Sequence, residues 1–301
     1  MTDISIIIPF FGKEGRIDSL LENLQSQSQA LEEEVEIIIV DNNEVPILKE
    51  RKGVALFHEP IPGSYAARNR GVDQAKGKFL FFTDSDCCPH ESWLREGLKE
   101  IKERGGIVAG HIELKYEKAT PKPLELYERV FYFQQSNYIK EESYGATANL
   151  IVEREVFKRH GKFDSALRSG GDQEFCKRMV SCGVGLSYAK KVIVFHPTRS
   201  EWIPFLVRRV RALSGNIFLL YRTEGFTWQQ LREKLPYYYD QDKMKTWNGD
   251  WDFYNSLSEK EQLSIRRCHR VLTIVDMLVL FSSKFSYKLM KKLTMIDRMI
   301  H

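Results

Sequence analysis

The chain has 301 residues, of which 43% are apolar and 29% charged, the balance of a folded globular protein. This composition excludes a disordered, a collagen-like and a disulfide-scaffold protein. The net charge of +4 is too small to indicate a nucleic-acid-binding protein, so we expect no nucleic-acid partner.

The first hundred residues alternate between β-branched apolar stretches and amphipathic helical stretches. Strands are predicted at Ile4–Pro9, Val35–Val40, Val54–His58 and Lys78–Thr83. Helices are predicted at Asp18–Gln29, Ser64–Ala75 and Ser92–Arg104. The strands read as continuous apolar runs, which is typical of strands buried on both faces of a parallel sheet. The alternation therefore predicts an α/β domain with a mostly parallel central sheet flanked by helices.

After residue 110 this rhythm changes. Further strands are predicted at His111–Tyr116, Ala148–Val152, Gly185–Tyr188 and Val192–Phe195, and helices at Leu124–Ser136, Arg154–His160 and Gln173–Cys182. From Pro204 onward the pattern is helical, with aromatic loops at Tyr237–Tyr239 and Trp247–Tyr254. We therefore expect an α/β domain over residues 1–200 and a helical C-terminal extension over residues 201–301.

Two carboxylates follow one of the predicted strands directly, in the tripeptide Asp84-Ser85-Asp86. Ligands of α/β sheets bind beyond the carboxyl ends of the strands, where these two side chains can converge on one divalent cation. Carboxylate oxygens suit Mg²⁺ or Mn²⁺, and such a cation stabilises a diphosphate leaving group. By itself the tripeptide also fits a turn or a helix cap.

Two other polar residues stand at the same predicted edge. Asp41 ends the second strand, where a carboxylate can accept the N3–H of a uracil ring or a ribose hydroxyl; a turn-forming Asp-Asn-Asn is the alternative. Arg68 lies in the helix before the Asp84 strand and is either a phosphate ligand or a surface arginine. No glycine-rich dinucleotide or phosphate loop follows the first strand, which argues against nicotinamide and P-loop chemistry.

A second group of candidates lies in the later half of the predicted domain. The stretch Gly170–Phe175 places Asp172 at a helix start with Glu174 two residues on, and a carboxylate base is what transfer to an acceptor hydroxyl needs. The alternative is an N-cap with acids in the first turn. His196 ends the last strand and either completes a metal site or is structural.

Taken together, seven short elements resemble glycosyltransferase family 2, which has the GT-A fold. They occur in the family's order and cover roughly residues 1–200. The elements are Ser5-Ile6-Ile7-Ile8-Pro9, Ile39-Val40-Asp41-Asn42, Ala67-Arg68-Asn69-Arg70-Gly71, Phe82-Thr83-Asp84-Ser85-Asp86, Gly161-Lys162-Phe163-Asp164, Gly170-Gly171-Asp172-Gln173-Glu174-Phe175 and Val194-Phe195-His196.

The resemblance implies an enzyme that transfers a sugar from a nucleotide-diphosphate donor, with a UDP-sugar favoured, to a hydroxyl acceptor with inversion at the anomeric carbon. It implies Mn²⁺ or Mg²⁺ as cofactor. The acceptor would be a glycan or a lipid-linked glycan, as in polysaccharide biosynthesis.

The resemblance also implies roles for individual residues. Asp172 matches the catalytic base, with Glu174 as second choice. Asp86 would ligate the metal directly, Asp84 would contact it or the ribose, and His196 would add a ligand. The expected donor-binding set is Pro9, Phe10, Phe11, Asp41, Arg68, Asp84 and Ser85.

Three positions depart from the family's pattern. Phe10-Phe11-Gly12 stands where Thr-Tyr-Asn is frequent, and Asn42 replaces a second Asp, which leaves the nucleobase open. Gly171 precedes Asp172 where Glu is frequent, which leaves open whether Asp172 or Glu174 is the base. Alternative functions are a non-catalytic nucleotide-sugar-binding module and a sugar-1-phosphate nucleotidyltransferase, although the latter needs a basic glycine-rich loop that Gly12–Arg16 only approaches.

The C-terminal third is more basic than the rest of the chain. Residues 201–301 carry 17 basic and 11 acidic side chains, against 28 and 30 in residues 1–200. Basic and apolar side chains alternate around Arg208, Arg209 and Arg211 and again over Lys284–Lys292, which fits either a helix lying on an anionic bilayer or a helical cap.

The cysteines, the N-terminal residues and the longest apolar run bear on where in the cell the protein is found. The five cysteines include no Cys-x-x-Cys pair, and no basic region precedes the apolar N-terminal run. The longest apolar run, Val271–Phe281, contains Asp276 and is shorter than the ~20 residues of a membrane span. We expect a cytoplasmic protein, alternatively one bound peripherally to the inner face of the membrane.

Overall fold

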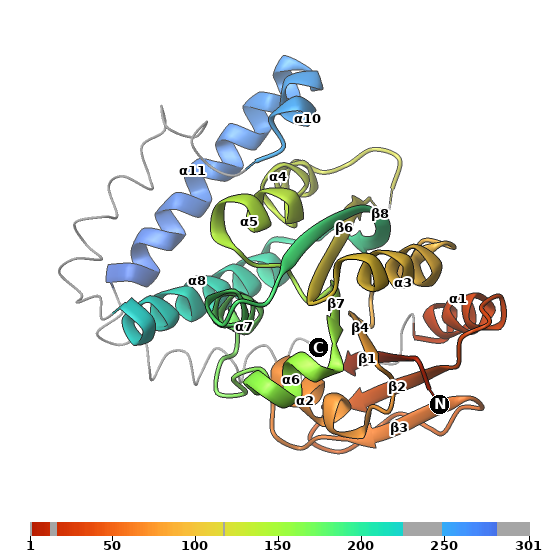
Figure 1. The fold of residues 1–301 in the computed structure, drawn as a ribbon. Coiled ribbons are helices and arrows are strands. Elements are labelled where there is room, and N and C mark those ends of the chain that lie inside the picture. Colours follow the sequence, from red (N-terminus) through yellow and green to blue (C-terminus); the bar gives the residue numbers. More distant parts are fainter. Residues whose placement is uncertain (1, 13–16, 117, 225–248, 282–301) are drawn as a thin grey trace. The chain divides into compact units, whose positions relative to one another are not determined.

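The computed structural model describes residues 2–12, 17–116, 118–224 and 249–281 (Figure 1). The chain divides into two units. Unit 1 comprises Met1–Glu113 and Gln135–Pro197, and unit 2 comprises Leu114–Gln134 and Thr198–His301. The second unit thus includes a segment from within the first 200 residues, and the functional boundary expected near residue 200 stays a prediction.

Within the described residues, eight strands form one sheet in the order β3-β2-β1-β4-β7-β6-β8-β5. In chain order the strands are β1 Ile4–Phe10, β2 Val35–Asp41, β3 Val54–His58, β4 Phe79–Thr83, β5 Cys88–Pro89, β6 Ile107–Lys115, β7 Asn149–Glu153 and β8 Leu186–Pro197. The half β3-β2-β1-β4 is parallel throughout. Strand β7 pairs antiparallel with β4 and β6, and β5 pairs antiparallel with β8.

Helices cover both faces of this sheet. The helices of unit 1 are α1 Ile17–Gln29, α2 Ser64–Gln74, α3 Trp93–Arg104, α5 Gln135–Glu142, α6 Arg154–His160 and α7 Gly171–Ser181. Phe81 and Phe82 of β4 point to opposite faces, because side chains alternate across a strand. The Phe81 ring packs edge-on against Trp93 of α3 at 5.3 Å, and the Phe82 ring lies 5.8 Å from Phe157 of α6.

One glycine sets how closely α3 approaches the sheet. A Cβ at Gly97 would lie 2.6 Å from the Phe81 ring, so only glycine permits this packing. The expected α/β class is confirmed, with parallel strands at the centre of the sheet and helices on both of its sides.

The structure corrects three of the predicted elements. The single helix expected over Leu124–Ser136 is two helices, α4 Pro123–Phe131 and α5, because the chain turns between them with Phe133 at a left-handed φ of 57°. The two strands expected in 185–195 are one strand, β8, which runs through the exposed pair Lys190-Lys191. Part of the expected aromatic loop is the helix α10, Trp251–Ser256; Tyr237–Tyr239 lie outside the described residues.

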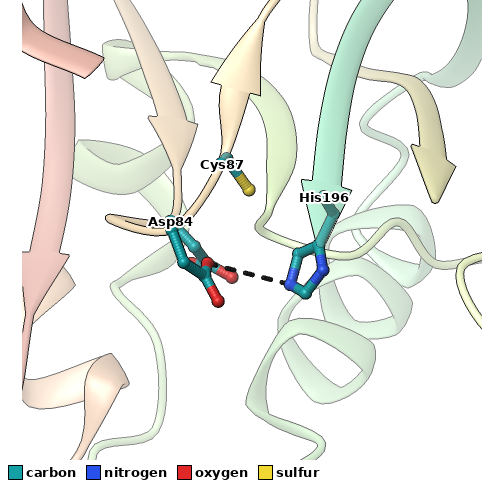
Figure 2. A group of neighbouring side chains, drawn as sticks. Asp84, Cys87 and His196 are labelled. Atoms are coloured by element: carbon teal, nitrogen blue, oxygen red, sulfur yellow. Dashed lines mark ion pairs between the residues drawn. The ribbon is translucent and has the colours of Figure 1, made fainter. Parts of the chain in front are cut away.

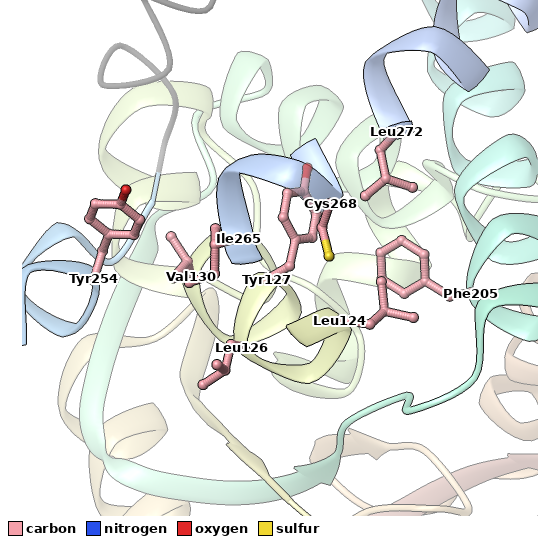
Figure 3. Packing of buried hydrophobic residues seen from close by; sticks show 9 residues of the cluster. All are labelled: Leu124, Leu126, Tyr127, Val130, Phe205, Tyr254, Ile265, Cys268 and Leu272. Atoms are coloured by element: carbon pink, nitrogen blue, oxygen red, sulfur yellow. The ribbon is translucent and has the colours of Figure 1, made fainter. Parts of the chain in front are cut away.

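Unit 2 is built around an apolar core between helices (Figure 3). Besides α4 and α10 it contains α8 Trp202–Glu224 and α11 Glu259–Phe281. Tyr127 of α4, Phe205 of α8 and Ile265 of α11 lie in this core and are at most 1% exposed. No helix of the described ranges is long and apolar enough to cross a membrane.

Two buried acids of unit 2, Glu128 and Asp276, are paired with arginines. The carboxylate of Glu128, which is fully buried, accepts hydrogen bonds from Arg199 and Arg208. Arg209 holds Asp276 with two N–H···O bonds of 2.7 and 2.5 Å. Of the two alternatives for Arg208 and Arg209, a membrane-facing helix or a helical cap, these ion pairs within unit 2 favour the cap. Lys284–Lys292 lie outside the described residues.

Candidate active site at the carboxyl ends of the strands

Asp84, Asp86 and Cys87, which follow β4, come together with His196 near the end of β8 (Figure 2). One possible ligand atom of each lies within 4.8 Å of the others, and His196 Nε2 is 3.8 Å from Asp86 Oδ1. The pairing of β5 with β8 brings these residues together. Cys88 of β5 pairs antiparallel with Phe195 of β8, so His196 lies opposite the residues that directly precede Cys88.

The backbone fixes which nitrogen of His196 faces this cluster. Its Nδ1 lies 2.8 Å from the carbonyl oxygen of Pro197, and a carbonyl can only accept, so Nδ1 carries the hydrogen. In the neutral ring Nε2 then presents its lone pair toward Asp86. This is the arrangement by which a hydrogen bond to one ring nitrogen orients the other as a metal ligand.

The chemistry of this group fits a divalent cation. Two carboxylates and an imidazole are the oxygen and nitrogen ligands that Mn²⁺ accepts and Mg²⁺ tolerates. The side chains of Asp84 and Asp86 remain 29% and 45% exposed, so a cation can reach them. Burial, together with Asp86 and Asp84, raises the pKa of the Cys87 thiol well above its usual range, so this side chain is a neutral thiol at neutral pH.

Arg68 joins the acidic pair to helix α2. Its Nη2 donates a 2.5 Å hydrogen bond to Asp84 Oδ1, and its guanidinium lies over the ring of Tyr65 at 5.5 Å. The residue is only 3% exposed, and its Nε has no partner among the described residues. A buried donor without a partner next to the candidate cation site suits the phosphate or ribose oxygen expected there.

Asp172 stands in the first turn of α7, after Gly170 in the left-handed region (φ 76°). Its Oδ1 accepts hydrogen bonds from the Tyr65 hydroxyl and the backbone N–H of Gln173, each 3.0 Å, and Oδ2 accepts one from the N–H of Thr147 at 3.3 Å. A Cβ at Gly171 would lie 2.6 Å from the Tyr65 ring, so glycine makes room for the tyrosine beside Asp172.

Tyr65 therefore connects the two parts of the site. It donates to Asp172 on one side and contacts Arg68 on the other, and Arg68 pairs with Asp84. Burial, and then the charge of Asp172, raises the pKa of Tyr65 above its ordinary value, so the hydroxyl keeps its proton and remains a donor. The acids of two distant stretches of sequence are thus joined through two side chains of α2.

Glu174, the second candidate base, has a different environment. Both its oxygens accept from Arg178, at 2.7 and 3.1 Å, one turn further along α7. The same guanidinium donates to the carbonyls of His160 and Lys162. Glu174 thus orients an arginine that ties α7 to the chain after α6.

Asp41, the expected nucleobase ligand, is 1% exposed at the end of β2. Oδ1 accepts from the backbone and side-chain nitrogens of Asn43, and Oδ2 accepts from the N–H groups of Ile47 and Leu48. Burial alone would raise its pKa, but these donors hold the pKa below its usual value. Four donors fill the roughly four acceptor positions of a carboxylate, so in this structure Asp41 organises the 42–48 loop.

The remaining expected donor-site residues lie at the same sheet edge. Phe10 ends β1 opposite Asp41 of β2, and its carbonyl accepts from the N–H of Asn42 at 2.7 Å. Pro9 precedes it in β1 and Phe11 follows with 41% exposure. Ser85 is half-buried between Asp84 and Asp86.

Two residues of this arrangement were not singled out by the motifs. Cys87 follows the Asp84-Ser85-Asp86 tripeptide directly, so its position next to a metal candidate was visible in the sequence. Tyr65 gave no such signal, because its partner Asp172 is 107 residues away and only folding brings the two together.

The fold and this site define a glycosyltransferase of the GT-A type. The family model described as glycosyl transferase family 2 matches residues 5–161, and the chain belongs to that family. Glycosyltransferase AglE of Haloferax volcanii is 33% identical over 206 residues, which cover 65% of this chain and 67% of AglE.

Other similar proteins cover the chain to different extents. The pre-mycofactocin glycosyltransferase of Mycobacterium tuberculosis is 22% identical over 223 residues, 69% of this chain but only 45% of that protein. Among solved structures, the mannosyltransferase PcManGT of Pyrobaculum calidifontis in complex with GDP-Man and Mn²⁺ superposes with a TM-score of 0.56 at 14% identity, covering 94% of this chain and 86% of the other. That likeness shows the GT-A fold.

Proposed function

We propose that this glycosyltransferase is a metal-dependent, inverting enzyme that moves a sugar from a nucleotide-diphosphate donor, favouring a UDP-sugar, to a hydroxyl of a glycan or lipid-linked glycan. The observation that carries the proposal is the connection of the acidic cluster to Asp172 through Arg68 and Tyr65. Under this proposal, the groups that bind the diphosphate and the group that takes the acceptor proton belong to one connected site.

At the donor end, Asp84, Asp86 and His196 would hold Mn²⁺ or Mg²⁺. The bound ion would offset the negative charge that collects on the departing diphosphate. Arg68, which is bonded to Asp84 through Nη2 and whose buried Nε has no partner in the described part of the chain, would donate to a phosphate or ribose oxygen. The mannosyltransferase complex with GDP-Man and Mn²⁺ supports a metal and a nucleotide sugar on this fold.

At the acceptor end, Asp172 takes the proton of the acceptor hydroxyl. The oxygen forms a bond to the anomeric carbon while the bond from that carbon to the diphosphate oxygen breaks on the opposite face, which inverts the centre. Tyr65, through its hydrogen bond to Oδ1, holds the carboxylate in place for this transfer. We assign the base to Asp172 because the oxygens of Glu174 are engaged by Arg178.

The experiment that tests this function is a thermal-shift panel of nucleotide sugars with Mn²⁺, followed by turnover of the best ligand. A ligand that binds only the folded state raises the melting temperature, so the panel identifies the donor. With that donor, Asp172→Asn should lower transfer by roughly 10²- to 10⁴-fold, the typical share of a general base, while the donor still shifts the melting temperature. Wild-type transfer by Asp172→Asn would reject the assignment, and Glu174→Gln tests the other candidate.

We also propose that the enzyme works in the cytoplasm at the inner face of a membrane, where lipid-linked acceptors are found. The exposed side of α11 supports this, since it carries Arg266, Arg267 and Arg270 next to apolar Ile274 and Leu278, which are 54% and 64% exposed. Basic and apolar side chains on one helix face suit anionic headgroups. Flotation with anionic liposomes but not with neutral ones is expected, and equal flotation in both would contradict the proposal.

A further inference from the structure

Two stacked tyrosines lie on α5 and the loop after it. The rings of Tyr138 and Tyr144 are 4.8 Å apart with an interplanar angle of 13°, and both residues are half-buried. Between them Ser143 adopts a left-handed φ of 56°, which a residue other than glycine rarely does. Such strained residues persist where the surrounding structure enforces them, and they concentrate at ligand sites.

A buried side chain enforces this loop. Gln135, 1% exposed, donates to the carbonyls of Gly110 and Asn149 and accepts a 2.7 Å hydrogen bond from the N–H of Ala146. The first residue of α5 is thereby tied to the strands β6 and β7 and to the loop that follows the helix. The tyrosine pair is therefore held on a fixed support.

The same loop is joined to the turn that carries Asp172. Gln173 donates to Glu142 at 3.2 Å, and the N–H of Thr147 donates to Asp172 Oδ2 at 3.3 Å. These two contacts bracket Tyr144 in the sequence. Burial, and then Tyr138, Glu142 and Asp172, raise the pKa of the Tyr144 hydroxyl, which agrees with a ring held near the carboxylates.

The two oxygens of Asp172 face different groups. Oδ1 accepts from Tyr65, which leads through Arg68 to the acidic cluster where the donor diphosphate is proposed to bind. Oδ2 accepts from the loop that carries the stacked tyrosines. The loop that carries Tyr144 thus contacts the oxygen of Asp172 that is not bonded to Tyr65.

We propose that Tyr138 and Tyr144 form a platform for a pyranose ring of the acceptor, which places a hydroxyl of that ring at Asp172. The inference rests on the proposed function and adds the residues that would bind the sugar ring of its saccharide acceptor. The apolar C–H face of a pyranose packs on aromatic rings, and Glu142 and Gln173 supply polar groups for its hydroxyls. Tyr138 and Tyr144 are binding residues here, and Asp172 remains the catalytic one.

The test uses the whole chain, the donor found by the thermal-shift panel and small acceptors. The probes are methyl β-D-glucopyranoside, methyl β-D-galactopyranoside and methyl α-D-mannopyranoside, with glycerol as a polyol without a ring. At least one pyranoside, but not glycerol, should increase nucleoside diphosphate release above donor hydrolysis. Tyr138→Ala should raise the KM for that pyranoside roughly three- to tenfold, the value of one aromatic contact, and more than it raises the KM for the donor.

Conservative replacements and a binding measurement separate stacking from a loss of structure. Tyr138→Phe and Tyr138→Trp keep an aromatic face and should restore the low KM. Saturation-transfer NMR should show the pyranoside signal in the wild-type chain, lose it in Tyr138→Ala and recover it in Tyr138→Trp. Tyr138 is half-buried on α5, whereas Gln135 at the start of the helix is 1% exposed. Variants of Tyr138 are therefore expected to keep the wild-type melting temperature to within a few degrees.

The outcomes distinguish this inference from the function on which it rests. An unchanged pyranoside KM and signal in Tyr138→Ala would overturn the platform while leaving glycosyl transfer intact. Stimulation by glycerol equal to that by the pyranosides would also overturn it. A wild-type chain that turns over no donor in the panel would instead reject the proposed function, and pyranoside binding by NMR would still decide the platform.

Discussion

Two strands of the same sheet end in aspartates that the fold treats in opposite ways. At the end of β2, Asp41 is 1% exposed and accepts four hydrogen bonds from the loop that follows it. After β4, the side chains of Asp84 and Asp86 are 29% and 45% exposed and lie near His196. All the acceptor positions of Asp41 are filled by donors from the following loop, whereas Asp84 and Asp86 keep acceptor positions that a ligand can use.

The difference shows that position at a strand end does not define a role. A carboxylate with about four filled acceptor positions stabilises a loop, and a nucleobase would have to displace one of those donors to bind it. A pair of partly solvated carboxylates beside an imidazole lone pair can gain a cation without breaking the fold. We therefore expect mutations at the two strand ends to separate ligand binding from stability.

The largest expected effect is on metal-dependent donor binding by Asp86→Asn. Loss of an outer-shell partner alone costs metal affinity roughly 10- to 100-fold, so removing a proposed ligand should cost at least that much. Calorimetric titration of Mn²⁺ with the nucleoside diphosphate present measures it. Asp41→Asn is the matched control at the other strand end and should retain the larger part of the affinity; equal losses in both variants would contradict the contrast drawn here.

The next effect concerns stability. Asp41→Ala leaves four donors of the 42–48 loop without their acceptor, and we expect the free energy of unfolding to fall by roughly 2–4 kcal/mol. Urea unfolding measures the change. Asp86→Ala, which removes a partly exposed carboxylate, should change the free energy of unfolding by less than about 1 kcal/mol. Equal destabilisation by the two variants would show that Asp41 does not organise its loop.

The stability contributed by Asp41 also depends on pH. Its folded pKa is lowered, so the contribution is fully present above the unfolded pKa, about 3.9, and is lost as pH falls through the folded value. The wild-type urea midpoint should therefore drop more steeply below about pH 4 than that of Asp41→Asn. Parallel curves for the two proteins would remove the basis for a charged, hydrogen-bonded Asp41.

Tyr65→Phe tests the connection between the two parts of the site. The change removes the hydroxyl that donates to Asp172 Oδ1, so the carboxylate loses one of the contacts that fix its orientation. We expect kcat/KM to fall by roughly tenfold or more, the equivalent of one hydrogen bond to a charged group.

Tyr188→Phe serves as the control for Tyr65→Phe. Tyr188 lies on β8, and its hydroxyl contacts His111 Nδ1 at 3.0 Å, so this variant also loses a tyrosine hydrogen bond. It should leave kcat/KM close to the wild-type value. A kcat/KM of Tyr65→Phe equal to that of the wild type would show that Tyr65 does not position the base.

The smallest effect is expected from Glu174→Gln. The pair with Arg178 spans one helical turn and is partly exposed, at 17% and 31%, so its loss should cost less than about 1 kcal/mol. Transfer should stay within about threefold of the wild type, because the variant leaves Asp172 in place. A loss comparable to that of Asp172→Asn would move the base to Glu174.

Part of this protein could be predicted from its sequence alone. Continuous apolar runs such as Ile4–Phe10 and Phe79–Thr83 gave the parallel strands, since local pattern and burial on both faces agree there. The motifs placed Asp84 and Asp86 at a strand end, and the family they indicated is confirmed. The break between α4 and α5 was missed, because the apolar period continues through Phe133 while its backbone turns.

Only the tertiary structure determines which of the candidate site residues contact one another. The register of β5 and β8 sets His196 against Asp86, and the passage of Tyr65 over Gly171 joins Asp172 to the donor groups. The sequence motifs could not distinguish Asp41, whose oxygens are fully hydrogen-bonded, from the partly exposed Asp86. Both follow an apolar strand in the sequence, and the difference lies in donors and neighbours that only the folded chain brings within hydrogen-bonding distance.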